Sequence, residues 1–286
     1  GPDGLFDVAN DSAFCLFEAY KLDGTKLWTI DCGPNIISSG HVETNIVAYD
    51  WDGDGKAELL MRAADGTIIH GANGDQVIGD LNKNYRNQIS HSANMTYATA
   101  GDEFLLYMEG ATAKLYNQRE FPLKRLEAGE TDLNKAWGDG YGHRANKFFF
   151  GAPYLDGRKP SIYLGRGIYT RHKMIAYDVN PQTHELTERW RWDCNTGGAW
   201  YGQGYHNFGI ADVDWDGRDE IVYGSMVIDD NGKGLSTTGL GHGDAQHCSD
   251  FDPYRKGQEI FACNENAQGA NYRDATTSQI YYMHHL

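Results

Sequence analysis

The stretch Asp50-Trp51-Asp52-Gly53-Asp54-Gly55-Lys56-Ala57-Glu58 is written a second time in this 286-residue chain, as Asp212-Val213-Asp214-Trp215-Asp216-Gly217-Arg218-Asp219-Glu220. Both copies place carboxylates at loop positions 1, 3 and 5, a glycine at 6, a backbone carbonyl at 7 and an acid at 9. Oxygen atoms in this order can converge on one hard cation, and the glycine permits the sharp turn. A solvated acidic turn is the alternative, but three alternating aspartates repel one another unless a cation neutralises them. We therefore expect calcium in both loops.

The expected ligands are the acids of each loop and the carbonyl at position 7: Asp50, Asp52, Asp54, Lys56, Glu58, Asp212, Asp214, Asp216, Arg218 and Glu220. A looser third copy has one inserted residue and no carboxylate at position 5, and its expected ligands are Asp250, Asp252, Tyr254 and Glu259. A fourth copy, at residues 152–160, keeps the turn but has too few ligands for a metal.

The loops are not flanked by the helices of an EF-hand. Each is followed by a short apolar run that reads as a buried strand: 59–61, 161–164, 221–223 and 260–262. Residues 19–31 and 176–193 read as hairpins. Strand, Asp loop, strand and hairpin recur with loop starts at 50, 152, 212 and 250, which is typical of β-propeller blades.

The gap between the first two loops predicts one more blade, from strands at 103–108 and 113–116. We count five or six blades in all. Residues 82–92 and 127–146 read as long covering or functional loops and not as linkers, so the whole of 1–286 is expected to be one domain.

Composition agrees with an all-β protein, because 35 glycines and 36 aromatic residues (18 Tyr, 11 Phe, 7 Trp) suit short strands joined by tight turns. The formal net charge of −15 argues against binding to nucleic acid or to an anionic membrane. No apolar run approaches the ~18 residues of a membrane span. Five cysteines without a Cys-x-x-Cys pair predict free thiols, mostly buried, instead of disulfides or a thiolate zinc site.

Several phrases in order along the chain resemble the rhamnogalacturonan lyases of polysaccharide lyase family 11. They are residues 27–36, the first Asp loop, 64–67, 137–144, 154–157, 169–171, 202–207 and 239–245. The resemblance implies an eight-bladed, calcium-binding propeller that cleaves the rhamnose–galacturonate backbone of pectin by β-elimination. Family members are longer, so it also implies that this chain is a large fragment, whose catalytic base lies beyond Leu286.

The register of the repeat predicts a second kind of site. His206 precedes Asp212 by six residues and Asp244 precedes Asp250 by six, so His206 and Asp244 should be neighbours. His242 lies two residues from Asp244, and Glu265 lies at the far end of the next strand. A uronate lyase needs a cation on the substrate carboxylate to stabilise the enediolate.

His206, His242, Asp244 and Glu265 are therefore the candidate catalytic residues, and the resemblance places a metal there too. Imidazole is an unusual calcium ligand, so either the ion keeps open positions or only Asp244 and Glu265 bind metal. A hydrogen-bonded structural network is the remaining alternative.

Candidate substrate-binding residues are aromatic, basic or amide side chains near these phrases. Trp200 and Tyr205 could stack on sugar rings, with core packing as the alternative. Arg144 and Arg171 could pair with uronate carboxylates, with internal ion pairs as the alternative. Asn207 follows His206 in the same phrase.

Two functions remain open. The first is a secreted, periplasmic or cell-surface lyase that acts on an acidic pectic polysaccharide with several calcium ions. The second is a non-catalytic, calcium-stabilised propeller that binds acidic glycans or a protein. In either case a second fragment of the same protein could complete the ring, and the sequence leaves endolytic and exolytic action undecided.

Overall fold

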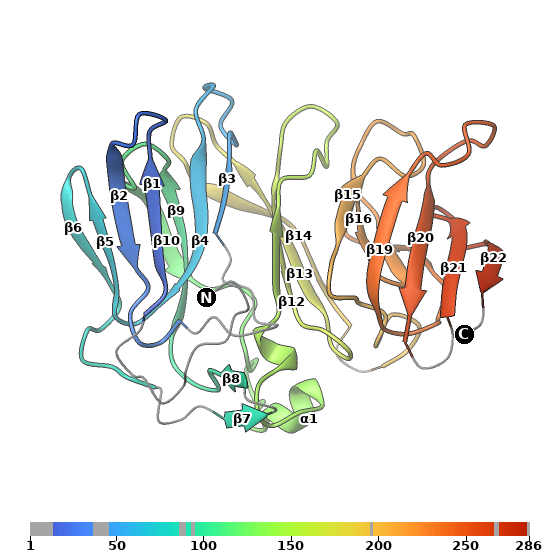
Figure 1. Ribbon diagram of the computed structural model, residues 1–286, viewed down its shortest axis with the longest axis horizontal. Coiled ribbons are helices and arrows are strands. Elements are labelled where there is room, and N and C mark those ends of the chain that lie inside the picture. The colour runs from blue at the N-terminus through green and yellow to red at the C-terminus, as the bar shows by residue number, and fades with distance from the viewer. Residues whose placement is uncertain are drawn as a thin grey trace. The chain divides into compact units, whose positions relative to one another are not determined.

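A computed structural model describes residues 14–36, 46–85, 90–92, 95–194, 197–265 and 269–284. This part of the chain forms five four-stranded antiparallel sheets and one two-stranded sheet (Figure 1). The all-β class is thus confirmed, and five sheets agree with the lower of the two blade counts. Closure of the sheets into a propeller stays a prediction.

The chain divides into two compact units, and the expectation of one domain over 1–286 also stays a prediction. Unit 1 comprises Gly1–Phe148 and Asn180–Glu185, and unit 2 comprises Phe149–Val179 and Leu186–Leu286. No described helix is long and apolar enough to span a membrane.

Unit 1 holds two four-stranded sheets. The first has the order β1 (Leu16–Tyr20), β2 (Lys26–Asp31), β5 (Thr67–Gly71), β6 (Gly74–Ile78). The second has the order β10 (Leu115–Glu120), β9 (Glu103–Glu109), β4 (Glu58–Ala64), β3 (Ile46–Tyr49). The two-stranded sheet consists of β7 (Ser90–Ser92) and β8 (Met95–Tyr97).

These pairings correct the prediction of a further blade at 103–116. Strand β9 pairs with β4 in register, Leu60 opposite Tyr107, so β9 and β10 complete the sheet of the first Asp loop. The chain between β4 and β9 returns to the first sheet as β5 and β6, where Ile30 of β2 lies opposite Ile69 of β5. Pairing between segments distant in the chain leaves no local pattern. The sequence between the first two Asp loops therefore wrongly predicted a separate blade.

The long loop at 127–146 contains α1 (Leu133–Trp137) and a 3-10 turn at Arg144–Asn146. Asp132 caps α1 by accepting from the N–H groups of Asn134 and Lys135, as an N-cap aspartate does. Trp137 is fully buried, and its indole N–H donates to the carbonyl of Arg125 at 2.6 Å. The loop is therefore anchored to unit 1 by a buried side chain.

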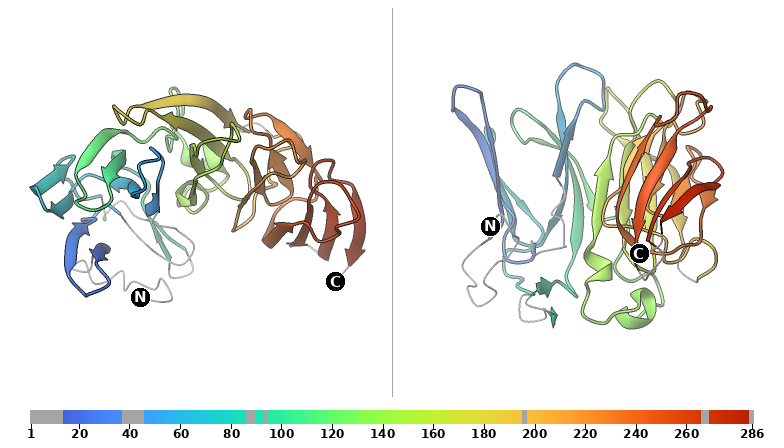
Figure 2. Two further views of the ribbon diagram at one scale, coloured as in Figure 1. Left: turned by 90° about the horizontal axis from the view of Figure 1, so that it is seen from above. Right: turned by 45° about the vertical axis from the view of Figure 1, so that its right-hand side comes forward.

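Unit 2 holds the other three sheets, whose strands lie side by side in Figure 2. One contains β11 (Phe148–Gly151), β12 (Ile162–Arg166), β13 (Lys173–Val179) and β14 (Leu186–Asp193). The next contains β15 (Gly209–Ala211), β16 (Glu220–Tyr223), β17 (Met226–Ile228) and β18 (Gly234–Thr237). The last contains β19 (Gly243–Ser249), β20 (Glu259–Asn264), β21 (Gly269–Asp274) and β22 (Ile280–His284).

The apolar runs after the loops form the cores, as predicted. Leu59 and Met61 pack in the core of unit 1, and Ile221 and Ile260 in cores of unit 2. Burial of such side chains is the main stabilising contribution, about 25 cal/mol per Å² of apolar surface. All five cysteines are free thiols; Cys32 and Cys194 are buried, whereas Cys263 is exposed.

Candidate functional site

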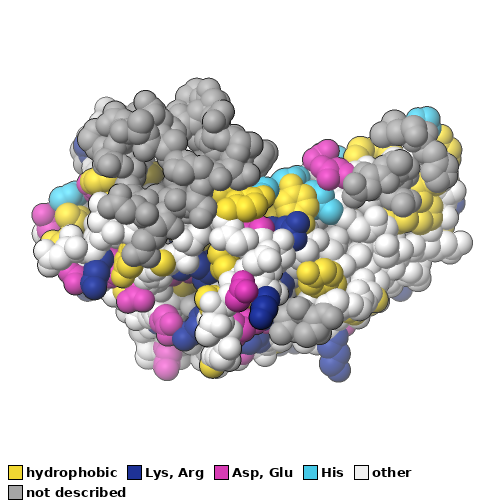
Figure 3. Space-filling view, turned by 90° about the horizontal axis from the view of Figure 1, so that it is seen from below, with side chains coloured by type: hydrophobic (Ala, Val, Ile, Leu, Met, Phe, Trp, Pro, Cys, Tyr) yellow, Lys and Arg dark blue, Asp and Glu magenta, His cyan; other side chains and the backbone are white. Residues whose placement is uncertain are grey.

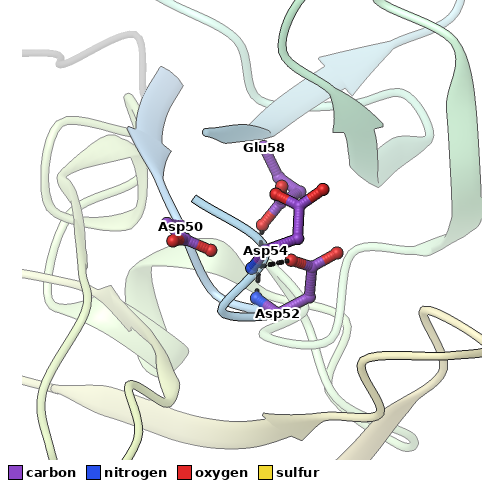
Figure 4. Close-up of side chains that lie close together, drawn as sticks. All are labelled: Asp50, Asp52, Asp54 and Glu58. Carbon is purple, nitrogen blue, oxygen red and sulfur yellow. Dashed lines mark hydrogen bonds between the residues drawn. The ribbon is translucent and has the colours of Figure 1, made fainter. Parts of the chain in front are cut away.

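The first acidic loop brings its carboxylates together. Oxygens of Asp50, Asp52, Asp54 and Glu58 lie within 4.8 Å of one another, which suits one coordination sphere with Ca–O distances of about 2.4 Å (Figure 4). Asp50 accepts hydrogen bonds from the N–H groups of Gly53 and Gly55, at 2.7 and 3.0 Å. Hydrogen bonds from the loop backbone to its own Asp50 carboxylate therefore hold the loop conformation.

The loop glutamate comes from the following strand and holds the backbone of the loop. Glu58 Oε2 accepts from the N–H of Trp51 at 2.9 Å and from the hydroxyl of Tyr107 at 3.2 Å. Burial raises the pKa of Glu58. His184 was not predicted as a residue of this site. Its ring stacks on that of Tyr116, with the centroids 3.7 Å apart, and its Nε2 lies 3.2 Å from Asp52 Oδ2.

The second loop has the same design. Asp212, Asp214 and Glu220 bring oxygens within 4.8 Å, whereas Asp216 is outside that group and accepts from the N–H of Arg218 at 2.9 Å. Glu220 Oε2 accepts from the N–H of Val213 at 2.8 Å. Burial, with added repulsion from the loop aspartates, raises the pKa of Glu220 to about 8. A nearby cation would favour its charged form.

The third loop differs from the other two. Asp252 pairs with Arg255 at 2.7 Å, and Glu259 Oε2 accepts from the N–H groups of Phe251 and Asp252. Tyr254 is 97% exposed. Within the described chain, the acids of this loop form no group that could surround an ion. A cation on Asp250, Asp252, Tyr254 and Glu259 stays a prediction.

The register argument for the second kind of site is confirmed in its geometry. His206 Nε2 lies 4.0 Å from Asp244 Oδ1, and the rings of His206 and His242 have centroids 4.9 Å apart. Glu265 is exposed, and its backbone N–H donates to the carbonyl of His242 at 3.1 Å. On the face shown in Figure 3, histidine side chains lie beside acidic and apolar ones.

His242 is held as a neutral imidazole with a free lone pair. Its Nδ1 lies 2.6 Å from the carbonyl oxygen of Gly204, which can only accept, so the proton is on Nδ1. Its Nε2 is buried and has no hydrogen-bond partner. Burial lowers the pKa of His242, which keeps the ring neutral. Nε2 can therefore accept a proton or bind a cation.

Tyr169 joins this cluster and was not among the predicted site residues. Its hydroxyl lies 3.2 Å from His206 Nε2, and its ring centroid lies 4.1 Å from that of His242. Its φ of 64° is in the left-handed region, which a bulky residue seldom adopts. Such strained backbone is common at functional sites. The φ angle itself has no sequence signal, but Tyr169 begins the segment 169–171 that resembles the family, and that segment could have pointed to it.

Two predicted substrate contacts are corrected. Tyr205 is fully buried in a core of unit 2 with Val222 and Ile260, so it packs instead of stacking on a sugar. Arg171 is 1% exposed and makes two hydrogen bonds to Asp193, at 3.0 and 2.7 Å. Its guanidinium is therefore engaged in an internal ion pair with Asp193 and does not face a substrate.

The remaining predicted contacts are partly exposed or structural. Trp200 is half-buried, and its ring lies edge-on to Trp192 with centroids 6.3 Å apart. Asn207 exchanges two hydrogen bonds with the backbone of Gln246, at 2.9 and 3.1 Å, and so joins the segment before β15 to β19. Arg144, in unit 1, lies 3.7 Å from Asp139. Their substrate roles stay predictions.

Comparison with known proteins agrees with the family suggested by the sequence phrases. Residues 9–286 match the family model described as "Rhamnogalacturonan lyase family 11, C-terminal domain". The rhamnogalacturonan exolyase YesX of Bacillus subtilis (strain 168) is 43% identical over 293 residues, covering 99% of this chain and 45% of the relative. The rhamnogalacturonan endolyase YesW of the same organism is 44% identical over 270 residues, covering 93% and 41%.

Solved structures show the same similarity. The crystal structure of YesX superposes with a TM-score of 0.84 at 42% identity, covering 98% of this chain and 45% of that one. A Bacillus licheniformis rhamnogalacturonan lyase gives 0.84 at 40% identity, covering 98% and 46%. The chain therefore belongs to rhamnogalacturonan lyase family 11, and it matches the C-terminal domain of that family. It spans less than half the length of the curated relatives it matches.

Proposed function

We propose that this chain is part of a polysaccharide lyase that cleaves the rhamnogalacturonan I backbone of pectin by calcium-dependent β-elimination at galacturonate. The family supports a lyase, and the cluster of Tyr169, His206, His242 and Asp244 carries the assignment to a site. Both named relatives are rhamnogalacturonan lyases, one an exolyase and one an endolyase, so the mode of action is left open.

β-Elimination removes the C5 proton of galacturonate and breaks the C4–O bond to leave an unsaturated uronate. A calcium ion, when bound, would neutralise the uronate carboxylate and stabilise the enediolate. Asp244 and Glu265 offer exposed carboxylates for such an ion, and His242 offers the unpartnered lone pair of Nε2. His206 and the Tyr169 hydroxyl lie within hydrogen-bond distance, so they can hold a proton next to the substrate. A general base beyond Leu286 remains part of the proposal.

The remaining parts of the proposal concern architecture and location. We infer that the five sheets are blades of one propeller domain, which a second part of the same protein completes, and that calcium ions in the Asp loops stabilise them. The structural calcium is supported by the clusters of carboxylates at the first and second Asp loops, one cluster in each loop. A substrate that belongs to plant cell walls implies a secreted, periplasmic or cell-surface protein. The net charge of −15 supports neither nucleic acid nor an anionic membrane as a partner.

The direct test is to incubate the longest polypeptide that carries this chain with rhamnogalacturonan and to follow the ultraviolet absorbance of the unsaturated uronate. We expect absorbance to rise with calcium and to stop when a chelator is added. Calorimetry with the same polysaccharide runs in parallel. Binding without any product would contradict the lyase and favour a non-catalytic glycan-binding propeller.

A further inference from the structure

Two cysteines face each other at the open end of the first hairpin. Strands β1 and β2 are antiparallel neighbours with Leu16 opposite Asp31, so the next pair outward is Cys15 and Cys32 (Figure 1). The backbone agrees, because the N–H of Cys32 donates to the carbonyl of Cys15 at 2.9 Å. Side chains that are opposite in such a pair point to the same face of the sheet. Both cysteines accordingly pack in or against the core of unit 1.

The two thiols are in contact and differ in their surroundings. A hydrogen bond joins them, and this bond, together with burial, raises the pKa of the Cys32 thiol well above its usual value. Cys32 is fully buried, whereas Cys15 is only half-buried. Cys15 is therefore the thiol that a reagent in solution reaches first, and Cys32 is the protonated partner behind it.

The spacing of the two strands suits a disulfide. Opposite residues in an antiparallel pair have Cα atoms about 4.5–5.5 Å apart, and a disulfide needs about 4.4–6.8 Å. The Cβ atoms of a disulfide are about 3.5–4.5 Å apart, slightly closer than in most cross-strand pairs. Cys15 lies just before β1 begins, so this approach requires no rearrangement of the strand.

Cys32 is held in place from the side away from β1. The hydroxyl of Thr67 donates to the carbonyl of Cys32 at 3.1 Å. The next residue, Gly33, has a φ of 68°, and a Cβ there would lie 2.3 Å from the carbonyl oxygen of Gly66. By contrast, β1 is the edge strand of its sheet. A covalent bond between Cys15 and Cys32 would thus fasten an edge strand to a fixed one.

The other three cysteines lie in unit 2 and have different neighbours. Cys248 lies opposite Ile260, and Cys263 lies opposite Ala245. The sulfur of Cys194 accepts from a backbone N–H at 3.2 Å. Within the described ranges, strand register therefore brings one pair of thiols together.

We propose that Cys15 and Cys32 form a disulfide when the folded protein meets a small-molecule disulfide such as oxidised glutathione. The thiolate of Cys15 attacks one sulfur of the oxidant and releases one small thiol, which leaves a mixed disulfide on Cys15. Cys32 then gives up its proton and attacks the sulfur of Cys15, which releases the second small thiol. Two electrons and two protons thus pass from the protein to the oxidant.

This inference goes beyond the proposed lyase function and does not depend on it. The hairpin is already closed at its turn, where the N–H of Lys21 donates to the carbonyl of Thr25 at 2.8 Å. A disulfide would close the other end and restrict the unfolded chain. The oxidised protein should therefore melt about 5 °C higher than the reduced protein. Disulfides persist outside the cytosol, which is the location proposed above.

The test oxidises the folded, longest available polypeptide that carries this chain with oxidised glutathione, after the reductant has been removed. Remaining thiols are alkylated, and the peptides are mapped by mass spectrometry. Trypsin cuts after Lys21 and Lys26, between the two cysteines, so the disulfide links two separate peptides. We expect the linked peptides in most molecules, and the melting temperature should fall by the stated amount when a reductant is added. The exposed Cys263 should carry glutathione in the same sample, which shows that the oxidant acted.

Variants separate the two steps of the reaction. In Cys32→Ser the second thiol is missing, so glutathione should stay on Cys15. Cys248→Ser removes another half-buried cysteine and is the matched control, which should keep the linked peptides. Should Cys32→Ser not fold, Cys15→Ser is the second variant, and it should leave Cys32 without glutathione and without a linked peptide.

Two results would overturn the proposal. One is lasting glutathione on Cys15 in the protein that retains Cys32. The other is alkylation of both cysteines as free thiols in a sample in which Cys263 carries glutathione. Either result would leave the proposed function standing, because neither measurement involves lyase activity.

Discussion

At the scale of single residues, the cluster around His242 owes its properties to burial and to hydrogen-bond partners. The Gly204 carbonyl selects the tautomer with the proton on Nδ1, and burial keeps the ring neutral. Asp244 is exposed on the same cluster, so its charge is available to a ligand. The acid and the imidazole therefore differ in role although they are two residues apart.

The Asp244→Asn variant tests the catalytic role of this carboxylate. We expect activity on rhamnogalacturonan to fall about 100-fold or more, because a preorganised charge next to the substrate is lost. The melting temperature should move little, since the Asp loops remain intact. Specific activity and thermal unfolding of the longest available polypeptide measure both. Wild-type activity per folded molecule would remove Asp244 from the active site.

His172 makes a pH dependence of stability predictable. It is fully buried, and burial lowers its pKa from 6.5 to about 3. The unfolded chain therefore takes up a proton on His172 below about pH 6.5, whereas the folded chain does not. Above that pH the neutral, buried imidazole costs no stability, and the free energy of unfolding falls as the pH drops toward 3.

We expect the free energy of unfolding to fall less steeply between pH 6 and 4 in His172→Gln than in the unmodified chain, by up to about 1.4 kcal/mol per pH unit. Denaturant titrations at several pH values measure the slope. His247→Gln is the control, because this side chain is exposed and lies in water in both states. Equal slopes for His172→Gln and the unmodified chain would contradict the prediction.

At the scale of elements, the loop glutamate connects cation binding to folding. It belongs to the strand but holds the loop backbone, as the hydrogen bonds from Trp51 to Glu58 and from Val213 to Glu220 show. An ion in the loop would therefore also stabilise the strand that follows. The same arrangement at Glu259 persists with an arginine beside Asp252, so the loop geometry does not require an ion at every copy.

Asp214→Ala should lower the melting temperature and remove the extra stabilisation that we propose calcium to provide at the second loop, because ion binding to the folded state shifts the folding equilibrium. Thermal unfolding with calcium and with chelator measures that shift. Asp156→Ala, in the fourth copy that lacks the ligands, is the control and should retain the calcium-dependent shift. A full shift in Asp214→Ala would argue against an ion at this loop.

The long loop of unit 1 depends on one aromatic anchor. In Trp137→Phe the carbonyl of Arg125 loses its donor, and a buried acceptor left unpaired costs about 1–3 kcal/mol. We expect the free energy of unfolding to drop by that amount in denaturant titrations. Trp215→Phe, at an exposed tryptophan, should change it by less than about 0.5 kcal/mol. A similar small change in Trp137→Phe would show that the hydrogen bond is dispensable.

At the scale of the whole molecule, calcium is expected to act as a shared stabiliser. Acidic groups in both compact units bring carboxylate oxygens within 4.8 Å. Chelation should therefore lower the melting temperature reversibly, and calcium should restore it better than magnesium, which demands stricter octahedral geometry. Differential scanning calorimetry of the stripped chain with either cation measures this. Unchanged melting in chelator would contradict structural calcium throughout.

The sequence by itself was sufficient for the family, the all-β class, the two well-matched Asp loops and the strands that follow them. These features are local: alternation, turn residues and carboxylate spacing are readable within ten residues. The register of the repeat also carried one non-local inference, because it predicted that His206 and Asp244 are neighbours.

Only the tertiary structure decided which strands share a sheet and which polar groups are satisfied. The return of β5 and β6 to the first sheet, the burial of Tyr205 and Arg171, and the approach of Tyr169 to His206 depend on contacts between distant segments. The unpaired oxygen of Glu220 also depends on the neighbouring strand, where Val227 lies opposite Val222 at the position that Tyr107 holds opposite Leu60 in the sheet of the first loop. Spacing along a chain does not report such pairings, because they are selected by packing of the folded core.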